Sequence, residues 1–283
     1  MTVEANAKVN LALEVYGRRA DGYHGLRSVV LPIGLADELT IDASPDGEVS
    51  SDTGYGDGDL VVCAARALRS ACPSAAGMGA RVHVEKRIPV GGGLGGGSAD
   101  AAATLRALNG LWGLGLGPEE LAGIGASVGS DVPALVLAQH YRTPVLMEGR
   151  GECVRPLDAQ ECAKLSKNCG LGRWIVLANP GVESSTAEVY AHCKPRSESP
   201  SARFDASAAP VNDLQAAACG LHPEIATALA ALVAAGAGDV MMSGSGSTVF
   251  GFSESESAAS RIAAAMETVG CRTWVTQVKW SFQ

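Results

Sequence analysis

The chain begins with a strict alternation of hydrophobic and polar residues. Val3 and every second residue up to Val15 are apolar, and charged or polar residues fill most of the positions between them. Period-two alternation is typical of a strand with one buried face, so we predict a strand over residues 3–15. Shorter apolar runs predict further strands over residues 28–33, 38–42, 81–86, 173–178, 248–252 and 273–278.

Helical spacing of apolar residues separates several of these predicted strands. Leu105, Leu108 and Trp112 recur every three or four positions, which predicts a helix that starts near Ser98. The other predicted elements are helices over residues 60–68, 119–127, 223–235 and 254–269, a helix start near 130–133, a hairpin over 143–157, and polar loops over 45–58 and 192–210. At 283 residues, the chain is long enough for one large domain or two of ordinary size.

The most unusual stretch lies between the strand at 81–86 and the helix near Ser98. Six of the seven residues from Gly91 to Gly97 are glycine, and only Leu94 interrupts them. Glycine has no side chain to block a ligand, and the first amides of a helix are unpaired and carry about half a positive charge. A bare loop that leads into a helix N-terminus therefore predicts a phosphate site, with a flexible glycine turn as the alternative.

Two familiar phosphate-binding motifs do not describe this loop. Residues 91–96 fit the letters of the dinucleotide fingerprint, as any glycine run does, but no acidic residue follows at about twenty residues to hold a ribose. The Gly-Lys-Ser/Thr of a Walker A loop is absent. We therefore expect another kind of phosphate loop and keep a dinucleotide-dependent oxidoreductase as a rival hypothesis.

Composition narrows the class of protein. Hydrophobic residues make up 47% and aromatic residues only 5%, so the core must be aliphatic and rich in alanine. The net charge of −8 argues against a nucleic-acid binder. We also expect no membrane association, because no apolar run reaches the ~18 residues of a span. The start lacks the basic and apolar regions of a signal peptide, so we expect a cytoplasmic protein whose eight scattered cysteines are reduced. We expect it to be a monomer or a homodimer.

Polar residues at a few positions are candidates for chemistry. Lys8 and Asn10 lie on the polar face of the first strand, where a solvated face is the simplest interpretation. Tyr23 and His24 lie in a polar loop, where they offer a stacking ring and a hydrogen-bonding group. Asp131 is most simply a helix cap. The Ser/Gly turn over residues 243–247 is either an anion site or a plain tight turn.

Taken in order, these stretches resemble one family. Pro89-x3-Gly93-Leu94-Gly95-Gly96-Gly97-Ser98-Ala99 resembles the phosphate loop of the GHMP small-molecule kinases, and Ser243-Gly244-Ser245-Gly246 resembles their third motif. Residues 7–11 and 17–24 resemble, more specifically, the subfamily of 4-diphosphocytidyl-2-C-methyl-D-erythritol kinases. So do Asn179-Pro180…Ser185-Thr186-x-x-Val189-Tyr190 and Val211-Asn212-Asp213-Leu214. The resemblance runs in order from about residue 5 to residue 252.

The resemblance implies an α+β, two-domain GHMP kinase fold. Residues 1–160 would form a half like domain 2 of ribosomal protein S5, residues 161–283 a ferredoxin-like half, and the site would lie in the cleft between them. The implied reaction moves the γ-phosphoryl group of ATP, with Mg²⁺, to the 2-hydroxyl of a cytidine diphosphate-linked methylerythritol. This is a step of the non-mevalonate route to isoprenoid precursors.

Residue roles follow from the same resemblance. Asp131 would be the catalytic base and Lys8 its partner, and Ser98 would lie close to Mg²⁺. The implied ATP-binding residues are Pro89, Gly91, Gly92, Gly93, Leu94, Gly95, Gly96, Gly97, Ser98 and Ala99. The implied substrate-binding residues are Asn10, Tyr23, His24, Tyr190, Ser243 and Gly244.

The sequence also departs from the family pattern. Ala99 replaces a second serine, Asp59 stands where an asparagine is usual, and Ala134 and Leu135 replace two aromatics. Residues 138–142 replace an expected glycine turn. Two alternatives within the superfamily stay open, namely a kinase of the homoserine or mevalonate type and a catalytically silent nucleotide-binding relative.

Overall fold

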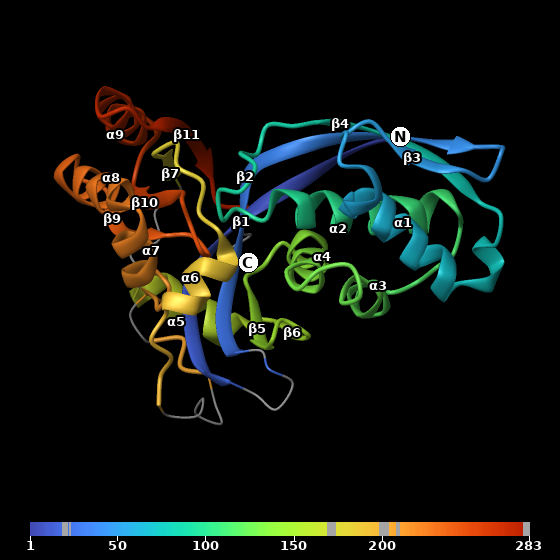
Figure 1. The fold of residues 1–283 in the computed structure, drawn as a ribbon, viewed down its shortest axis with the longest axis horizontal. Helices are drawn as coiled ribbons and strands as arrows, with labels where there is room; N and C mark the ends of the chain where they lie inside the picture. The colour runs from blue at the N-terminus through green and yellow to red at the C-terminus, as the bar shows by residue number, and fades with distance from the viewer. Residues whose placement is uncertain (19–21, 23, 169–173, 198–203, 208–209, 280–283) are drawn as a thin grey trace.

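Two β-sheets organise the part of the chain that the computed structural model describes, which comprises residues 1–18, 22, 24–168, 174–197, 204–207 and 210–279 (Figure 1). The larger sheet has the order β3-β4-β2-β1-β8, with β5 paired to β2 and β6 to β5. Its strands are β1 (Thr2–Arg18), β2 (His24–Ser44), β3 (Val49–Ser51), β4 (Gly79–Glu85), β5 (Val145–Gly149), β6 (Cys153–Pro156) and β8 (Val211–Asn212). The smaller sheet, ordered β11-β7-β10-β9, contains β7 (Trp174–Asn179), β9 (Gly238–Met242), β10 (Val249–Ser253) and β11 (Arg272–Gln277).

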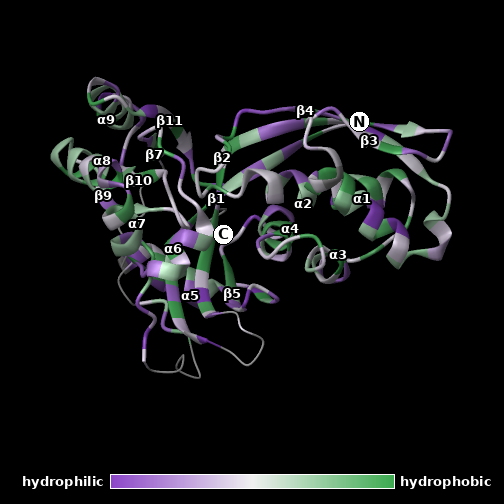
Figure 2. Ribbon diagram, in the orientation of Figure 1, coloured by the Kyte–Doolittle hydropathy of each residue, from purple (hydrophilic) through white to green (hydrophobic). Residues whose placement is uncertain are grey.

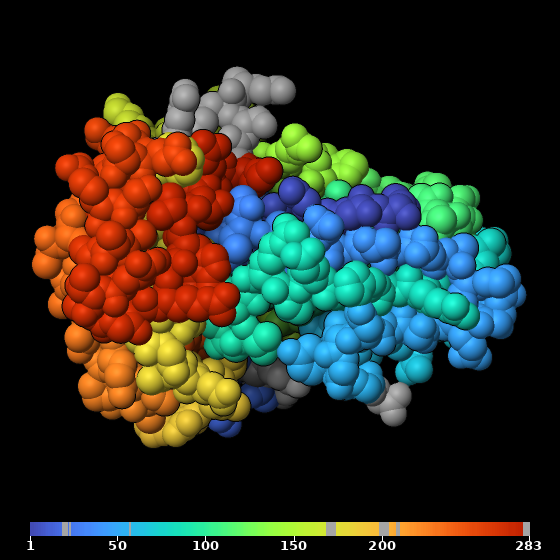
Figure 3. Space-filling view, turned by 90° about the horizontal axis from the view of Figure 1, so that it is seen from above, coloured from blue at the N-terminus to red at the C-terminus, as the bar shows by residue number. Residues whose placement is uncertain are grey.

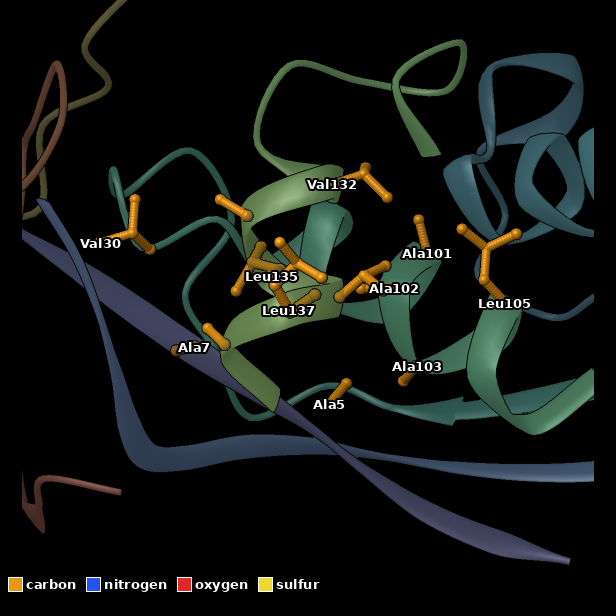
Figure 4. Packing of buried hydrophobic residues seen from close by; sticks show 14 of the residues in the cluster. Ala5, Ala7, Val30, Ala101, Ala102, Ala103, Leu105, Val132, Leu135 and Leu137 are labelled. Atoms are coloured by element: carbon orange, nitrogen blue, oxygen red, sulfur yellow. The ribbon is translucent and has the colours of Figure 1, made fainter. Parts of the chain in front are cut away.

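Four helices cover one face of the larger sheet (Figure 1). They are α1 (Leu60–Ala71), α2 (Gly96–Leu111), α3 (Pro118–Gly125) and α4 (Val132–Tyr141). Helix α1 is amphipathic and mixes green and purple residues in Figure 2. Buried alanines such as Ala101 and Ala102 let the backbone of α2 pack closely, and Figure 4 shows them on the side of α2 next to Val132, Leu135 and Leu137 of α4. Small residues therefore build this core, as the low aromatic content predicts.

The smaller sheet carries its own helices, α8 (Pro223–Ala234) and α9 (Glu256–Thr268). Helix α8 packs on β9 and β10, and α9 packs on β7 and β11. In Figure 3 these orange and red C-terminal residues lie directly against the blue and teal N-terminal ones. The remaining helices are α5 (Ala159–Asn168), α6 (Thr186–His192), α7 (Gln215–Leu221) and the 3-10 turns Gly56–Gly58 and Pro73–Ala75.

The elements predicted from a long hydrophobic periodicity are confirmed. The strand over 3–15 lies within β1, the helix near Ser98 is α2, which begins at Gly96, and the hairpin over 143–157 is β5–β6. The two strands predicted over 28–33 and 38–42 are wrong as separate elements, because β2 is continuous. Gly34 does not break β2 but lets β11 pass, since a Cβ there would lie 2.6 Å from Thr276 Oγ1.

The elements that the pattern missed are short. They are β3 inside the predicted loop over 45–58, together with α5, α6, α7, β8 and β9. Of the polar connection over 192–210, the described part includes Arg196, which bridges to Tyr16 of β1. The seven described cysteines are free thiols, in agreement with the prediction. No single helix in the described ranges is long and apolar enough to cross a membrane.

Candidate active site

A cavity of about 500 Å³ opens between the two sheets. Its wall includes β1, the glycine loop before α2, the start of α4, α6 and the turn after β9. The predicted site residues that line it are Lys8, Asn10, Pro89, Gly91, Gly92, Gly93, Gly95, Gly96, Gly97, Ser98, Asp131, Tyr190 and Gly244. Leu94 and Ala99 are buried beneath this surface, with 1% and 0% exposure. The structure thus brings together segments from the whole length of the chain.

The glycine loop has a backbone shape that requires glycine. Gly91, Gly93 and Gly95 have φ of 70°, 75° and 68°, in the left-handed region that other residues avoid. A Cβ on Gly93 would lie 2.2 Å from the carbonyl oxygen of Ser243, so the loop also passes too close to the C-terminal half for a side chain. The loop ends at Gly96, the first residue of α2. The first amides of a helix have no partner within it, and Gly96, Gly97 and Ser98 line the cavity. This arrangement suits a phosphate chain.

Lys8 lies beneath this loop. It is 3% exposed, and its ammonium donates to Asn10 Oδ1 at 2.7 Å and to the carbonyl oxygen of Gly93 at 2.9 Å. The solvated-face interpretation of Lys8 and Asn10 is therefore wrong. The pairing of β1 with β2 shifts register between Asn6 and Lys8 and again between Asn10 and Ala12. Such bulges re-aim side chains, and they are common beside active sites.

Asp131 approaches Lys8 from α4. Its Oδ2 lies 3.4 Å from Lys8 Nζ, and its side chain is 31% exposed. Asp131 occupies the position before α4 but its side chain makes no capping bond, so the capping interpretation is wrong. Pro133 in the first turn removes one amide that would otherwise need a partner. The carboxylate is thereby left to face both the ammonium and the cavity.

The Ser/Gly turn supports the loop from the other half of the molecule. Ser243 is fully buried, and its hydroxyl donates to the Gly93 carbonyl oxygen at 2.9 Å, the atom that also accepts from Lys8. A Cβ on Gly244 would lie 3.4 Å from Lys8 Nζ and 3.5 Å from Asn10 Oδ1. Gly244 lines the cavity, whereas Ser243 contacts the loop.

A second cavity of about 650 Å³ continues from the first and shares Leu26, Ser130, Thr186 and Tyr190 with it. The rings of His24 and Tyr190 stack there with centroids 6.0 Å apart. Burial, together with the charge of Asp131, raises the pKa of Tyr190 to about 12, so its phenol stays neutral at ordinary pH. The predicted contact Tyr23 lies outside the described residues.

Sequence reasoning missed an ionic cluster behind the loop. Lys86 pairs with Asp100 at 2.7 Å and with Asp37, and Lys86 and Asp100 both line the first cavity. Burial raises the pKa of Asp100 to about 7 against the opposing effect of Lys86, and its Oδ1 has no hydrogen-bond partner. Burial also depresses the pKa of Lys86, but the two carboxylates outweigh this effect and raise it above its ordinary value. The sequence indicated this cluster only through Lys86 and Asp100, two charged residues on either side of the glycines.

Asp59, the departure from the family pattern, caps α1. Its Oδ1 accepts from the amide of Val61 at 2.9 Å, and its Oδ2 accepts from the hydroxyls of Thr53 and Ser51. Asp59 also lines the first cavity, as does the exposed Tyr55. An asparagine here would carry an amide NH2 group in place of one carboxylate oxygen, so Asp59 offers two acceptors where asparagine would offer one acceptor and one donor group.

A divalent cation would find few protein ligands here. The described residues contain no group of three or more His, Cys, Asp or Glu that could hold a metal ion. Ser98, in the first turn of α2, offers a hydroxyl near the segment that leads to Asp131, since a Cβ on Gly129 would lie 3.8 Å from Ser98 Oγ. This donor set fits Mg²⁺, which keeps several waters and binds through phosphates and one or two protein oxygens.

Comparison with known protein families covers both halves of the chain. The model of the N-terminal domain of GHMP kinases matches residues 59–139, and that of their C-terminal domain matches residues 203–270. A curated 4-diphosphocytidyl-2-C-methyl-D-erythritol kinase of Citrifermentans bemidjiense is 39% identical, over 95% of this chain and 95% of its own.

Solved structures give the same relationship. A crystal structure of 4-(cytidine 5'-diphospho)-2C-methyl-D-erythritol kinase has a TM-score of 0.81 and 32% identity, over 98% of this chain and 99% of that one. The mevalonate kinase of Methanococcus jannaschii has a TM-score of 0.69 and 14% identity, over 98% of both chains. At that identity the second likeness concerns the fold alone.

Proposed function

We propose that this chain, which belongs to the 4-diphosphocytidyl-2-C-methyl-D-erythritol kinases of the GHMP kinase family, transfers the γ-phosphoryl group of ATP to the 2-hydroxyl of 4-diphosphocytidyl-2-C-methyl-D-erythritol. Its α+β GHMP kinase fold and its class as a phosphotransferase acting on an alcohol agree with the expectation from the sequence. The product would enter the non-mevalonate route to isoprenoid precursors.

In this proposal Asp131 is the general base. The substrate oxygen forms a bond to the γ-phosphorus, the bond from that phosphorus to the β,γ-bridging oxygen breaks, and ADP leaves. The proton of the 2-hydroxyl moves to the Asp131 carboxylate, which is 31% exposed and does not cap α4. A positioned base typically accelerates such a step by ~10²–10⁴-fold.

Lys8 provides a fixed positive charge beside the reacting atoms. Its ammonium is held by Asn10 and by the Gly93 carbonyl oxygen, and it lies 3.4 Å from Asp131. A charge that is already oriented stabilises the negative charge of the transition state without further reorganisation. The contact between Lys8 and the loop supports a site in which the acid–base chemistry would take place next to the phosphates.

The glycine loop and the N-terminus of α2 would hold the nucleotide phosphates. The amides of Gly96 and Gly97 open the helix, and the absence of side chains lets the phosphates approach the backbone. Bound Mg²⁺ would neutralise charge on the phosphates. Ser98 is the protein group proposed to hold it.

The second cavity would take the cytidine end of the substrate. His24 and Tyr190 bring two flat rings to its wall, and the neutral phenol of Tyr190 keeps its ring suited to stacking. Stacking of a base on an aromatic ring contributes about 1–3 kcal/mol. Substrate identity would thus be read at a distance from the reacting hydroxyl.

The single observation that carries the proposal is the meeting of Lys8, Asp131 and the Gly93 carbonyl oxygen in one cavity. The test is ADP release by the purified chain with ATP and 4-diphosphocytidyl-2-C-methyl-D-erythritol, compared with homoserine and with mevalonate. We expect turnover of the cytidine-linked substrate only, and turnover of either other alcohol alone would overturn the substrate assignment.

A variant tests the base directly. We expect Asp131→Asn to lower kcat by ~10²–10⁴-fold, since the amide accepts no proton. The matched control is Asp46→Asn. It changes an exposed carboxylate that pairs with Arg81 just after the C-terminal end of β2. Equal turnover of the Asp131 variant and the wild type would instead identify a catalytically silent relative or a different base.

A further inference from the structure

The segment of residues 211–213 is fixed on the edge of the larger sheet. Residues Val211 and Asn212 pair in parallel with Ala12 and Leu13 of β1. The amide of Asp213 donates to the Leu13 carbonyl oxygen at 2.9 Å, and the Asp213 carboxylate accepts from the amide of Val15 at 2.9 Å. Arg196 adds a two-pronged ion pair to the same carboxylate. This short segment therefore moves with β1, the strand that carries Lys8.

The side chain of Asn212 reaches from this segment to the other sheet. Its amide nitrogen donates to the carbonyl oxygens of Met242 and Gly244, both at 2.8 Å, and its Oδ1 accepts from the Leu214 amide at 2.9 Å. Asn212 is 8% exposed, so these bonds are shielded from water. Both amide hydrogens are donated to carbonyl oxygens at the turn that follows β9. No shorter or charged side chain offers two donors and one acceptor in this geometry.

The turn held by Asn212 rests on the reaction centre. Gly244 lies so close to Lys8 and to the Gly93 carbonyl oxygen that a Cβ would stand 3.4 Å and 3.2 Å from them. Ser243 donates to the same carbonyl oxygen at 2.9 Å. A continuous set of contacts therefore leads from the amide of Asn212, through the turn, to the ammonium of Lys8.

We infer that Asn212 is a positioning residue for phosphoryl transfer. It fixes the Ser243–Gly244 turn relative to β1, so that the Gly93 carbonyl oxygen and the Lys8 ammonium keep their alignment with Asp131. This inference rests on the proposed kinase function. Its action is geometric, because Asn212 touches neither the nucleotide loop nor Asp131 and does not line either cavity.

The inference predicts a loss of turnover without a loss of nucleotide affinity. Asn212→Ala removes both donors, and a displacement of about 1 Å at a reacting group costs roughly 10²-fold in rate, so we expect kcat to fall by that factor. The KM for ATP should stay within about threefold, because the glycine backbone that would hold the phosphates is unchanged. Asn212→Asp should be slower still, since it sets a carboxylate oxygen against two carbonyl oxygens.

A matched control is Asn109→Ala. Asn109 also bridges a turn with its amide, to the carbonyl oxygen and the amide of Leu116, both at 3.0 Å, but it lies at the far end of α2. Its kcat should equal that of the wild type. All variants are assayed at a temperature at which circular dichroism shows them folded. Asn212→Ser, which keeps one donor, should give an intermediate kcat and keeps the inference testable if the alanine variant does not fold.

Two failures are distinguishable in this experiment. If the wild-type chain itself releases no ADP with the cytidine-linked substrate, the proposed function is wrong. If the wild type turns over and folded Asn212 variants keep its kcat, Asn212 is merely structural and the inference is overturned. A rise in the KM for ATP with unchanged kcat would likewise overturn it, because the turn would then serve nucleotide binding.

Discussion

Gly93→Ala is the perturbation for which the structure gives the clearest magnitude. The new Cβ would lie 2.2 Å from the Ser243 carbonyl oxygen and 3.0 Å from that of Gly246, whereas ordinary contact begins near 3.4 Å. The loop and the turn must therefore separate by about 1 Å, a displacement that costs on the order of 10²-fold in rate when it reaches reacting groups. The left-handed backbone adds about 1–2 kcal/mol for a residue with a Cβ. Loss of the Ser243 hydrogen bond adds about 1 kcal/mol.

We therefore expect Gly93→Ala to lower the free energy of unfolding by about 2–3 kcal/mol and kcat by about 10²-fold. The matched control is Gly113→Ala, which has a φ of 64° but no atom within 4 Å of the new Cβ. It should cost only the backbone term of about 1–2 kcal/mol and leave kcat unchanged. Urea unfolding and ADP release measure the two quantities.

The comparison between the two alanine variants shows whether the contact between loop and turn sets the geometry of the reaction. If Gly93→Ala keeps kcat within threefold of the wild type, the close contact between loop and turn does not set the geometry of the reaction. If Gly113→Ala loses as much turnover as Gly93→Ala, the effect is general destabilisation and the reasoning from the 2.2 Å contact is refuted.

Three further predictions concern the surroundings of the reaction centre. The raised pKa of Asp100, about 7, means that the folded state binds a proton that the unfolded state releases near pH 4, so stability falls as pH rises between about 4 and 7. Asp100→Asn should remove about 1–3 kcal/mol of this pH dependence from the free energy of unfolding, measured by urea unfolding at several pH values, and an unchanged slope would contradict the assignment. Tyr190→Ala should raise the KM for the cytidine substrate by roughly 10-fold while Tyr190→Phe retains it, and equal effects of the two would exclude stacking. Asp59→Ala should lower the free energy of unfolding by about 1 kcal/mol through the lost cap of α1, whereas unchanged urea unfolding would show that the cap contributes nothing.

Much of the fold was predictable because its signals are local. The alternation in β1, the helical spacing in α2 and the glycine turn of the β5–β6 hairpin each specify one element without reference to the rest. The elements that were missed, such as β3, β8 and α6, are too short for a period to emerge. β8 exists because β1 offers its free edge, and two residues carry no pattern that announces such pairing.

The phosphate loop was predictable from residue type and order, and the candidate base Asp131 only from the family resemblance, whereas the residues alone did not predict the burial of Lys8. A polar residue on an alternating strand is solvated unless something covers that face, and here the covering groups are the loop, 85 residues away, and the turn near Gly244. The cluster of Lys86, Asp37 and Asp100 was missed for the same reason. Its members lie on β2, the end of β4 and α2, and only the packing of α2 on the sheet brings them together.

The contact between Gly93 and Ser243 also has a consequence for the synthesis and folding of the enzyme. Lys8, the glycines and Asp131 leave the ribosome long before the turn at residue 243, and that turn has its place only once β9 and β10 have paired on either side of it. A nascent N-terminal half would thus carry the chemical groups without the brace that aligns them. Recovery of turnover during refolding should therefore report the docking of the two sheets.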